Sequence, residues 1–459
     1  MRKFWLRRFA WVAVAAALLA SPAAAAQYIL QISSGASISQ ITSQYGLVVV
    51  RQLSDDGHSV YLVSGLDPAP PNFVQQVSAN PAVTEFELDS KVDSPETPPA
   101  ANPIANLAAL TAASFDQTTI SYYGATVRNS YVSQPSASLI NLPSALSTFA
   151  TGAGIVGVID TGVDPTHPAL QGVLVPGYDF TRDQPGYASE WADLSQSTVA
   201  ILDQSTVAIL DGWQFPMLLN QSTVAILDQS TVAILDGGQL PSDFGHGTMV
   251  SGLIHLVAPT ARIMPLKAFH SDGTANLSDI VRAIYYAVDN GAKVINMSFS
   301  SHTQYASLTA AIAYATSQNV ICVASGGNEG REEYTVYPAG DVGSFGLGST
   351  DSSDQRSNFS NYAAKSVRMA APGEALITTY PGNHYAGVWG TSFSTALTSG
   401  AAALLAQIAP QITPANAINA LKHGHKLDDE DLGSNRLDLY ATLLYYLTPH
   451  TAQSGGGYN

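Results

Sequence analysis

Three short motifs carry residues that can perform nucleophilic catalysis. An Asp-Thr-Gly at 160–162 follows an apolar run, a Gly-His-Gly-Thr spans 245–248, and a Gly-Thr-Ser spans 390–392. In a catalytic triad, a histidine takes the proton of a serine hydroxyl, and an aspartate orients the imidazole. Asp160, His246 and Ser392 follow one another in a known order of such triads. We therefore predict that these three residues form a catalytic triad.

Each motif alone also has a simpler reading. The Asp-Thr-Gly could end a strand as an ordinary turn, or be half of an aspartic protease, but no second Asp-Thr-Gly or Asp-Ser-Gly occurs. Of the ten histidines, only His246 has glycine on both sides, which favours close approach of a substrate to the backbone. Ser392 could merely cap a helix, although a helix N-terminus also stabilises an alkoxide. The combination is more specific than any member.

A fourth motif supplies a candidate oxyanion donor. Asn328 lies in Ala-Ser-Gly-Gly-Asn-Glu-Gly, directly after the apolar run 320–324. An asparagine amide in such a loop can donate a hydrogen bond to the oxyanion of acyl transfer. The alternative is a loop asparagine in a left-handed turn. We predict that Asn328 and the backbone N–H of Ser392 bind the oxyanion.

The elements that must position these motifs alternate between strands and helices from about residue 130 to 445. Apolar runs suit strands that are buried on both faces of a parallel sheet, and they occupy 155–159, 263–266, 294–297 and 320–324. Segments of helical spacing lie between them, at 277–290 and 306–318. The pattern predicts an α/β fold with a doubly wound parallel sheet, whose ligands bind beyond the carboxyl ends of the strands.

The N-terminal segment 1–26 is typical of a secretory signal peptide. Four of its first eight residues are basic, an apolar stretch follows at 9–20, and the segment ends in small residues. An uncleaved membrane anchor is the alternative, but the stretch is short for spanning a bilayer. We expect a secreted protein, extracellular or periplasmic, without a stable membrane span in its mature form.

Residues 27–92 form a separate small unit in the sequence pattern. The expected order is strand, helix, two strands, helix, strand, which is the split βαβ or ferredoxin-like α+β arrangement. A Pro-rich linker and N-terminal extension follow at 93–129, then the catalytic domain at 130–445 and a Gly-rich flexible tail at 446–459.

A repeat insert at 194–238 interrupts the catalytic domain. The octamer Gln-Ser-Thr-Val-Ala-Ile-Leu-Asp occurs there four times without change. Its β propensity predicts short strands or a stacked flap, and the alternative is an unstructured expansion. We expect any such apolar edge to be covered or paired, because an open one promotes aggregation.

The net charge and the cysteine content limit which binding partners and which covalent cross-links we expect. The net charge is −16, and no basic run follows the first few residues, which argues against nucleic acid. Cys322 is the single cysteine, so no internal disulfide can form, and its apolar strand indicates a packed core thiol. We expect a monomer.

The motifs together resemble those of the subtilisin-like serine proteases (subtilases) over about 130–445. Besides the triad motifs and the Asn328 loop, Val-Ile-Asn-Met-Ser, Ser-Asn-Phe-Ser and Ala-Pro-Gly appear in family order. The resemblance implies a serine endopeptidase that cleaves protein or peptide substrates through an acyl-enzyme. Residues 27–92 resemble the family's inhibitory, folding-assisting propeptide, which implies an autoprocessed precursor with its own intramolecular inhibitor.

The resemblance also implies a substrate-binding set. An extended substrate would lie along Ser298, Phe299 and Ser300, where the family usually has Ser-Leu-Gly. The remaining members flank the main specificity pocket and are Ser325, Gly326, Gly327 and Val336. Because Val336 replaces a frequent glycine at the pocket floor, and Ser300 could narrow the pocket, we expect small or medium side chains to be preferred.

Some departures bear on cofactors and on the nucleophile helix. The long loop that often chelates calcium after the histidine helix is absent, and Ala169 stands where that site often has an aspartate. We therefore expect no metal site and no cofactor, with calcium elsewhere left open. Ala396 replaces a proline of the nucleophile helix, which removes no catalytic atom.

Two rival functions remain compatible with the sequence. One is a non-catalytic secreted protein that uses this fold and its repeats for binding or structure. The other is an esterase with the same triad. The Asn328 motif argues against the first, and the propeptide-like unit with the peptide-binding strand argues against the second.

Overall fold

The computed structural model describes residues 25–54, 59–66, 68–93, 109–194, 217–218, 224–226 and 241–448. Nearly all of the expected signal peptide, residues 94–108 of the linker and extension, most of the repeat insert, and the tail from 449 onward lie outside these residues.

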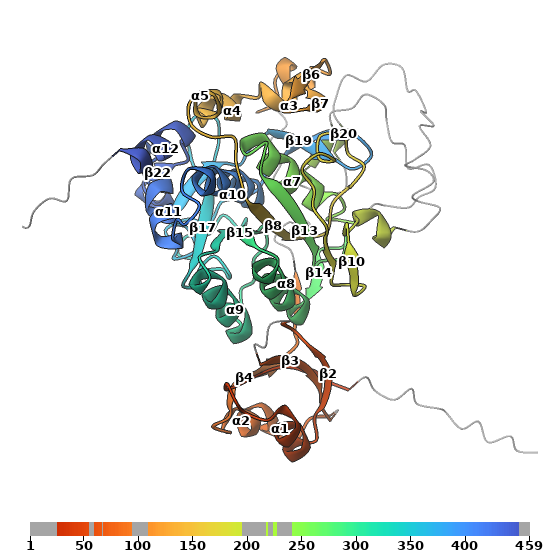
Figure 1. Cartoon of the computed structure of the whole chain (residues 1–459). Coiled ribbons are helices and arrows are strands. Elements are labelled where there is room, and N and C mark those ends of the chain that lie inside the picture. The colour runs from red at the N-terminus through yellow and green to blue at the C-terminus, as the bar shows by residue number, and fades with distance from the viewer. Residues whose placement is uncertain are drawn as a thin grey trace, which may run out of the picture.

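A ten-stranded sheet forms the centre of the larger unit (Figure 1). Its strands, in spatial order, are β10 (Gln184–Gly186), β9 (Gly177–Asp179), β13 (Arg262–Lys267), β8 (Ile155–Asp160), β15 (Ala292–Met297), β16 (Ile321–Ser325), β17 (Ser344–Thr350), β18 (Met369–Pro372), β22 (Asn435–Arg436) and β21 (His425–Lys426). The strands from β9 to β22 pair in parallel, whereas β10 and β21 pair antiparallel at the two ends. The α/β fold with a parallel sheet is confirmed.

Helices cover both faces of this sheet. Alternate residues of β8 point to opposite sides: Val156 and Val158 join the core beneath α7 and α10, whereas Ile159 joins the core beneath α8 and α9. This two-sided burial explains the unbroken apolar runs in the sequence. The helices of this unit are α3 (Asn129–Val132), α4 (Pro135–Leu139), α5 (Leu142–Thr148), α7 (His246–Val257), α8 (Leu277–Asp289), α9 (Ala306–Ser317), α10 (Thr391–Ile408), α11 (Pro414–Leu421) and α12 (Leu439–Leu447).

Short elements complete the larger unit. The one-turn helices are η2 (Ala112–Phe115), η3 (Glu190–Asp193) and η4 (Glu430–Leu432), and a hairpin joins β6 (Thr119–Tyr122) to β7 (Ala125–Arg128). The hydroxyl of Tyr122 donates to the carbonyl of Leu256 in α7 at 2.5 Å, which fastens the hairpin to that helix.

One copy of the repeat forms a strand. A second sheet has the order β11 (Met217–Leu218), β12 (Val224–Ile226), β20 (His384–Val388) and β19 (Leu376–Tyr380). β12 comes from the third octamer and pairs antiparallel with β20, with Ala225 opposite Gly387. The expectation of short, paired strands therefore holds at this copy, and the other copies lie outside the described residues.

Residues 27–88 fold into a four-stranded antiparallel sheet with two helices. The elements are β1 (Gln27–Ile32), α1 (Ile38–Tyr45), β2 (Val48–Gln52), β3 (Val60–Ser64), α2 (Phe73–Ser78) and β4 (Val83–Leu88), and the strand order is β2-β3-β1-β4. One face of the sheet packs on α1 and α2 through Leu30 and Val77, and the other face contributes Ile29 and Leu62 to the core beneath α8. This unit thus lies against α8 and α9 (Figure 1).

Two acidic side chains fasten this small unit to helix N-termini. Glu87 accepts hydrogen bonds from the backbone N–H groups of Ala306 and Ser307 at the start of α9, at 3.2 and 2.7 Å. Asp89 accepts from the backbone and the hydroxyl of Ser278 in α8, at 2.8 and 2.7 Å. Carboxylates at these positions satisfy otherwise unpaired N–H groups and favour the helix dipole. After these contacts, β5 (Lys91–Asp93) pairs with β14 (Thr274–Asn276).

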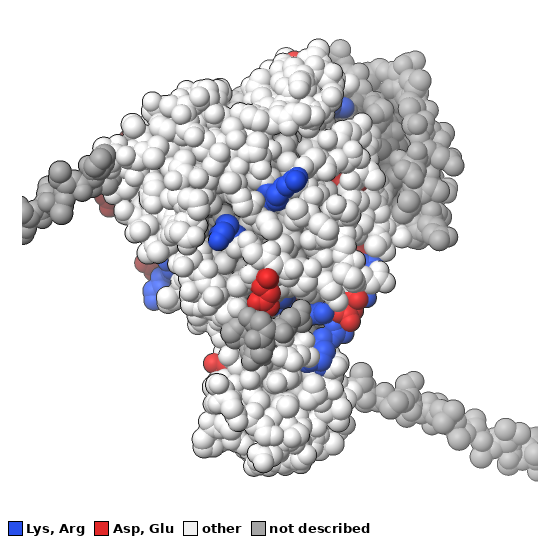
Figure 2. Space-filling model, viewed as in Figure 1, with Lys and Arg blue, Asp and Glu red and all other residues white. Residues whose placement is uncertain are grey.

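The described surface is sparsely charged. In Figure 2, acidic and basic side chains are few and scattered over the face in view. Among the described residues, no helix combines the length and hydropathy that a membrane crossing requires.

Candidate active site

Asp160 and His246 meet at the carboxyl edge of the central sheet. Asp160 is the last residue of β8, and His246 is the first residue of α7. The imidazole Nδ1 lies 2.8 Å from Oδ1 of Asp160, and both side chains are at least 95% buried. The same carboxylate oxygen accepts the backbone N–H of Thr161 at 2.7 Å. These bonds fix the imidazole orientation that a triad histidine needs.

Gly247 permits the close approach of α7 to the aspartate turn. A Cβ at this position would lie 2.0 Å from the carbonyl oxygen of Gly162 and 3.1 Å from Oδ1 of Asp160. Any side chain would therefore push the histidine away from the aspartate. The sequence analysis attributed the glycines beside His246 to access for the substrate, whereas this glycine serves packing within the protein.

Ser392 lies at the N-terminus of α10, behind Gly390 and Thr391. Its hydroxyl donates to the carbonyl oxygen of Ser298 at 3.2 Å, and its own carbonyl accepts from the Ser298 hydroxyl at 2.9 Å. The ring of the next residue, Phe393, lies 5.6 Å from the His246 ring, centroid to centroid. The imidazole and the serine are therefore brought to the same helix end, where the positive dipole favours an alkoxide.

Asn328 is held by the residue that precedes Ser392. Its Oδ1 accepts hydrogen bonds from the backbone N–H and the hydroxyl of Thr391, at 2.9 and 2.8 Å. Because the amide oxygen serves as the acceptor, the amide nitrogen is oriented as the donor of this side chain. The structure thus places an amide donor beside the predicted nucleophile.

The predicted substrate segment follows β15 directly. Ser298 contacts Ser392 as described, and Ser300 is 7% exposed. The Phe299 ring is buried against Phe269, with the ring centroids 5.0 Å apart, so its side chain belongs to the core. Ser301 pairs with Tyr337 through backbone hydrogen bonds of 2.6 and 2.8 Å. The backbone of 298–300 is therefore the part of this segment that a peptide could use.

The remaining predicted specificity residues lie next to β16 and Asn328. Ser325 ends β16, and Gly326 donates its N–H to the carbonyl of Leu347 at 2.9 Å. Gly327 has a φ of +98°, and a Cβ there would meet the Asn361 amide at 2.3 Å and a methyl of the fully buried Val336 at 3.3 Å. Gly327 and Val336 are thus neighbours, as a shared pocket requires.

Glu190, which no sequence motif indicated, lies beside Asp160 and His246 through its contacts with Thr161 and Thr248. This side chain is fully buried and accepts hydrogen bonds from the hydroxyls of Thr161 and Thr248, both at 2.8 Å, and from the Thr248 backbone at 3.1 Å. Burial raises the pKa of Glu190 to about 7, although the threonine bonds lower it, and the Asp160 charge raises it further. The only sequence signal was the threonine in each motif, whose buried hydroxyl needs a partner.

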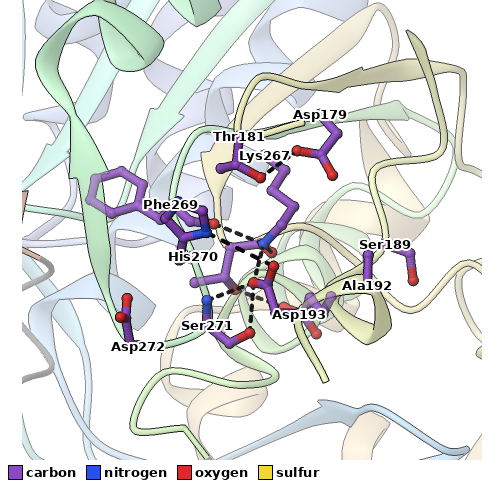
Figure 3. Close-up of polar contacts among 12 residues, drawn as sticks. Asp179, Thr181, Ser189, Ala192, Asp193, Lys267, Phe269, His270, Ser271 and Asp272 are labelled. Carbon is purple, nitrogen blue, oxygen red and sulfur yellow. Dashed lines mark hydrogen bonds and ion pairs between the residues drawn. The ribbon is translucent and has the colours of Figure 1, made fainter. Parts of the chain in front are cut away.

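A buried ion pair beneath the triad was also missed. Lys267, opposite Asp160 in the sheet, is fully buried, and its Nζ donates to Oδ2 of Asp193 and to the carbonyl of Thr161, both at 2.6 Å (Figure 3). Ser271 also binds Oδ2 of Asp193, and Arg182 binds the other carboxylate oxygen. Burial would raise the pKa of Asp193, but Lys267 and these donors lower it to about 2.

The described residues contain no group of three or more histidine, cysteine or acidic side chains that could hold a metal ion. Asp193 is already paired with Lys267 and Arg182. The sequence expectation about calcium stays a prediction.

Two further buried side chains, His167 and Cys322, have strongly shifted pKa values. His167 is fully buried, and its Nε2 lies 3.1 Å from the carbonyl oxygen of His384. Burial lowers the pKa of His167 to about 4, despite that hydrogen bond. Cys322 lies in β16 and is 1% exposed, and burial raises the pKa of its thiol to about 12.

Comparison with known proteins agrees with this geometry. Residues 152–439 match the sequence model of the Subtilase family. The chain is 33% identical to the thermophilic serine proteinase of Bacillus sp. (strain AK1) over 55% of this chain and 51% of that protein. It is 37% identical to subtilisin BL of Lederbergia lenta, over 39% of this chain and 69% of that protein. It is 29% identical to thermitase of Thermoactinomyces vulgaris, over 56% and 76% of the two chains. The first of these alignments spans only about half of the relative's length.

Proposed function

Because the chain belongs to the subtilase family, we propose that it is a secreted serine endopeptidase that hydrolyses peptide bonds through an acyl-enzyme. The observation that carries the proposal is the 2.8 Å contact between His246 Nδ1 and Asp160 Oδ1, made by a histidine whose ring lies 5.6 Å from that of Phe393, the residue after Ser392. A serine, a histidine and an aspartate in this arrangement suit acyl transfer.

In the proposed mechanism, Ser392 Oγ attacks the carbonyl carbon of the scissile peptide bond. His246 Nε2 takes the serine proton and later delivers it to the leaving amine, so that the C–N bond breaks and the acyl-enzyme forms. Water then attacks the ester carbon, with His246 again acting as the base. Asp160 keeps the imidazole in the tautomer that carries hydrogen on Nδ1 and stabilises its protonated form.

Asn328 supports the oxyanion part of this mechanism. With its Oδ1 bound to Thr391, the amide nitrogen can donate to the oxyanion together with the backbone N–H of Ser392. A donor that is fixed before the reaction needs no reorganisation as charge develops.

The proposed substrate is an extended protein or peptide segment that lies along residues 298–300 by strand addition. The buried Val336 beside Gly327 supports a preference for small or medium side chains at the main pocket. Glu329 is exposed, and its carboxylate accepts a hydrogen bond of 2.6 Å from the side-chain amide nitrogen of Asn361.

Residues 27–92 are proposed to be a propeptide that inhibits the catalytic unit until it is removed. Support comes from the docking of this unit on α8 and α9, where Glu87 and Asp89 bind the two helix N-termini. The proposal includes a monomeric protein and the signal peptide expected at 1–26.

The direct test is the Ser392→Ala protein. It should lose casein hydrolysis and labelling by a fluorophosphonate, and its precursor should keep residues 27–92. A matched control is Ser394→Ala, because this serine lies two residues further along the same helix and donates to the carbonyl oxygens of Ala371 and Pro372. If the Ser392→Ala protein hydrolysed casein and processed its precursor as the wild-type protein does, the proposal would be wrong.

The same assays separate the rival functions. A non-catalytic binding protein would not react with the fluorophosphonate at all. An esterase would react but would turn over an ester substrate without cleaving the matching peptide. N-terminal sequencing of the secreted protein locates any self-cleavage.

A further inference from the structure

Glu190 bridges the two turns that carry the triad acid and base. It is the first residue of η3, 30 residues away from Asp160 in the chain, and its carboxylate is fully buried. Oε1 receives the hydroxyl of Thr161 at 2.8 Å and the backbone N–H of Thr248 at 3.1 Å, and Oε2 receives the hydroxyl of Thr248 at 2.8 Å. All three bonds come from residues within two positions of Asp160 or His246.

These two threonines are themselves tied to the triad backbone. The N–H of Thr161 donates to Asp160 Oδ1 at 2.7 Å, and the Thr161 hydroxyl accepts the N–H of Gly247 at 3.1 Å. The Thr248 hydroxyl accepts the N–H of Asp164 at 2.7 Å, in the turn that follows Asp160. The separation between the end of β8 and the start of α7 therefore depends on bonds that pass through Glu190.

We propose that Glu190 is a positioning residue of the triad, which holds Thr161 and Thr248 so that Asp160 and His246 stay in hydrogen-bond contact. The inference rests on the proposed function, because it assigns Glu190 to the same reaction. Glu190 touches no reacting atom, so its effect passes through the two threonines. Burying a carboxylate is costly, and three donors aimed at it offset that cost.

The other end of η3 is anchored, which keeps Glu190 in place. Asp193 ends this short helix and binds Lys267 and Ser271, as Figure 3 shows. Lys267 also donates to the carbonyl of Thr161. Thr161 is therefore held by Glu190 directly and by Asp193 through Lys267. Among the described residues, the charge of Asp160 raises the pKa of Glu190, and Glu190 in turn raises the pKa of the buried Tyr380.

The test compares Glu190→Gln and Glu190→Ala with the wild-type enzyme, each produced as the full chain. Glutamine keeps the shape and one acceptor oxygen but cannot accept the Thr248 hydroxyl through its NH₂ group. We expect kcat to fall roughly tenfold for glutamine and on the order of a hundredfold for alanine, as misplaced catalytic groups do. KM should stay within about twofold of wild type, because no substrate contact is lost.

The pH profile distinguishes positioning from a loss of folded protein. The Glu190 carboxyl, as far as it is ionised around its pKa of about 7, favours the protonated imidazole beside Asp160, so Glu190→Gln should move the acid limb of kcat/KM to lower pH. The matched control is Asp341→Asn. That acid is also fully buried, and it accepts hydrogen bonds from the side chains of Gln304 at 2.7 Å and Thr309 at 2.9 Å. Neither bond involves a triad residue. It should lower the Tm while leaving kcat and the acid limb unchanged.

Each outcome decides the inference separately from the proposed function. If the wild-type enzyme is active and Glu190→Gln has the same kcat, the positioning role of Glu190 is wrong, but the proposed function stands. The same holds if Asp341→Asn loses as much kcat as Glu190→Gln does. An inactive wild-type enzyme overturns the proposed function instead. If Glu190→Gln does not fold, Thr161→Val removes one of its bonds and should lower kcat at unchanged KM. Wild-type kcat in that variant would overturn the inference.

Discussion

The Nδ1 atom of His246 lies 2.8 Å from Oδ1 of Asp160, although 86 residues separate the two in the chain. Their contact is produced by two junctions, the end of β8 and the start of α7. Gly247 lets these junctions approach, and Glu190 connects them through Thr161 and Thr248. The geometry of the pair is therefore set by residues that do not react.

Replacing Asp160 with asparagine should preserve the fold but present the wrong tautomer of His246. An amide can donate to Nδ1, which would leave the hydrogen on Nε2, where the base must accept a proton. We expect kcat for a peptide substrate to fall by about 10⁴-fold, with little change in Tm. Steady-state kinetics and thermal unfolding check this, and near-normal turnover would contradict the assigned role.

Replacing Asn328 with alanine should remove a transition-state contact and leave substrate binding nearly intact. The expected loss in kcat is about 10²- to 10³-fold. Thr391→Val removes one of the two bonds that orient the amide, so it should cause a smaller loss of kcat. Equal kinetics for Asn328→Ala and the wild-type enzyme would exclude an oxyanion role.

The α/β fold and the contact between Asp160 and His246 could be predicted because their signals are local. Apolar runs mark the parallel strands, and each triad member lies in a short motif where a strand or helix begins or ends. The orientation of Asn328 is not local, since it depends on Thr391, 63 residues later.

The roles of Glu190 and Lys267 could not be predicted, because they too depend on residues that are distant in the sequence. Lys267 ends an apolar strand, a position where a lysine is ordinarily exposed, and only the sheet pairing shows that it is buried beneath the triad. Glu190 stands in a segment without a motif, and its partners come from two distant turns. In both cases the decisive quantity is the burial of a charge, which depends on tertiary contacts.

Breaking the ion pair of Lys267 and Asp193 should destabilise the protein strongly. Asp193→Asn leaves the Lys267 ammonium buried without its carboxylate, and removing one partner of a buried pair typically costs about 3–5 kcal/mol. The double variant with Lys267→Met should recover part of the free energy of unfolding, because no uncompensated charge remains. Urea unfolding of the parent, Asp193→Asn and the double variant in a Ser392→Ala background measures this, and a double variant that is no more stable than Asp193→Asn would contradict it.

Thiol reagents should leave the folded enzyme unmodified and active. Cys322 is buried in β16, and burial raises the pKa of its thiol to about 12, so almost no thiolate is present at neutral pH. A chromogenic disulfide should react with one thiol per chain only after denaturation. Fast labelling of the native protein with loss of activity would show that Cys322 is accessible.

The contribution of His255 to stability should fall as the pH is lowered from about 6.5 to 4. Burial lowers the pKa of His255 to about 4, with a smaller effect of His167, and its ring lies edge-on to Tyr122. In this window the unfolded chain binds a proton that the folded protein excludes. The stability that His255 contributes is therefore complete above pH 6.5 and is lost as the pH falls toward 4.

The corresponding variant is His255→Leu, compared with its parent in a Ser392→Ala background to avoid autolysis. Without His255, the unfolded chain no longer takes up that extra proton. The slope of the free energy of unfolding against pH therefore changes by up to about 1.4 kcal/mol per pH unit. Groups with raised pKa values, such as Glu190 and Asp279, contribute slopes of the opposite sign, but they are present in both proteins and cancel in the difference. Urea unfolding at several pH values should therefore show the variant gaining on its parent as the pH falls from 6.5 to 4. A constant difference across that range would mean that His255 binds its proton equally well in the folded and unfolded chains.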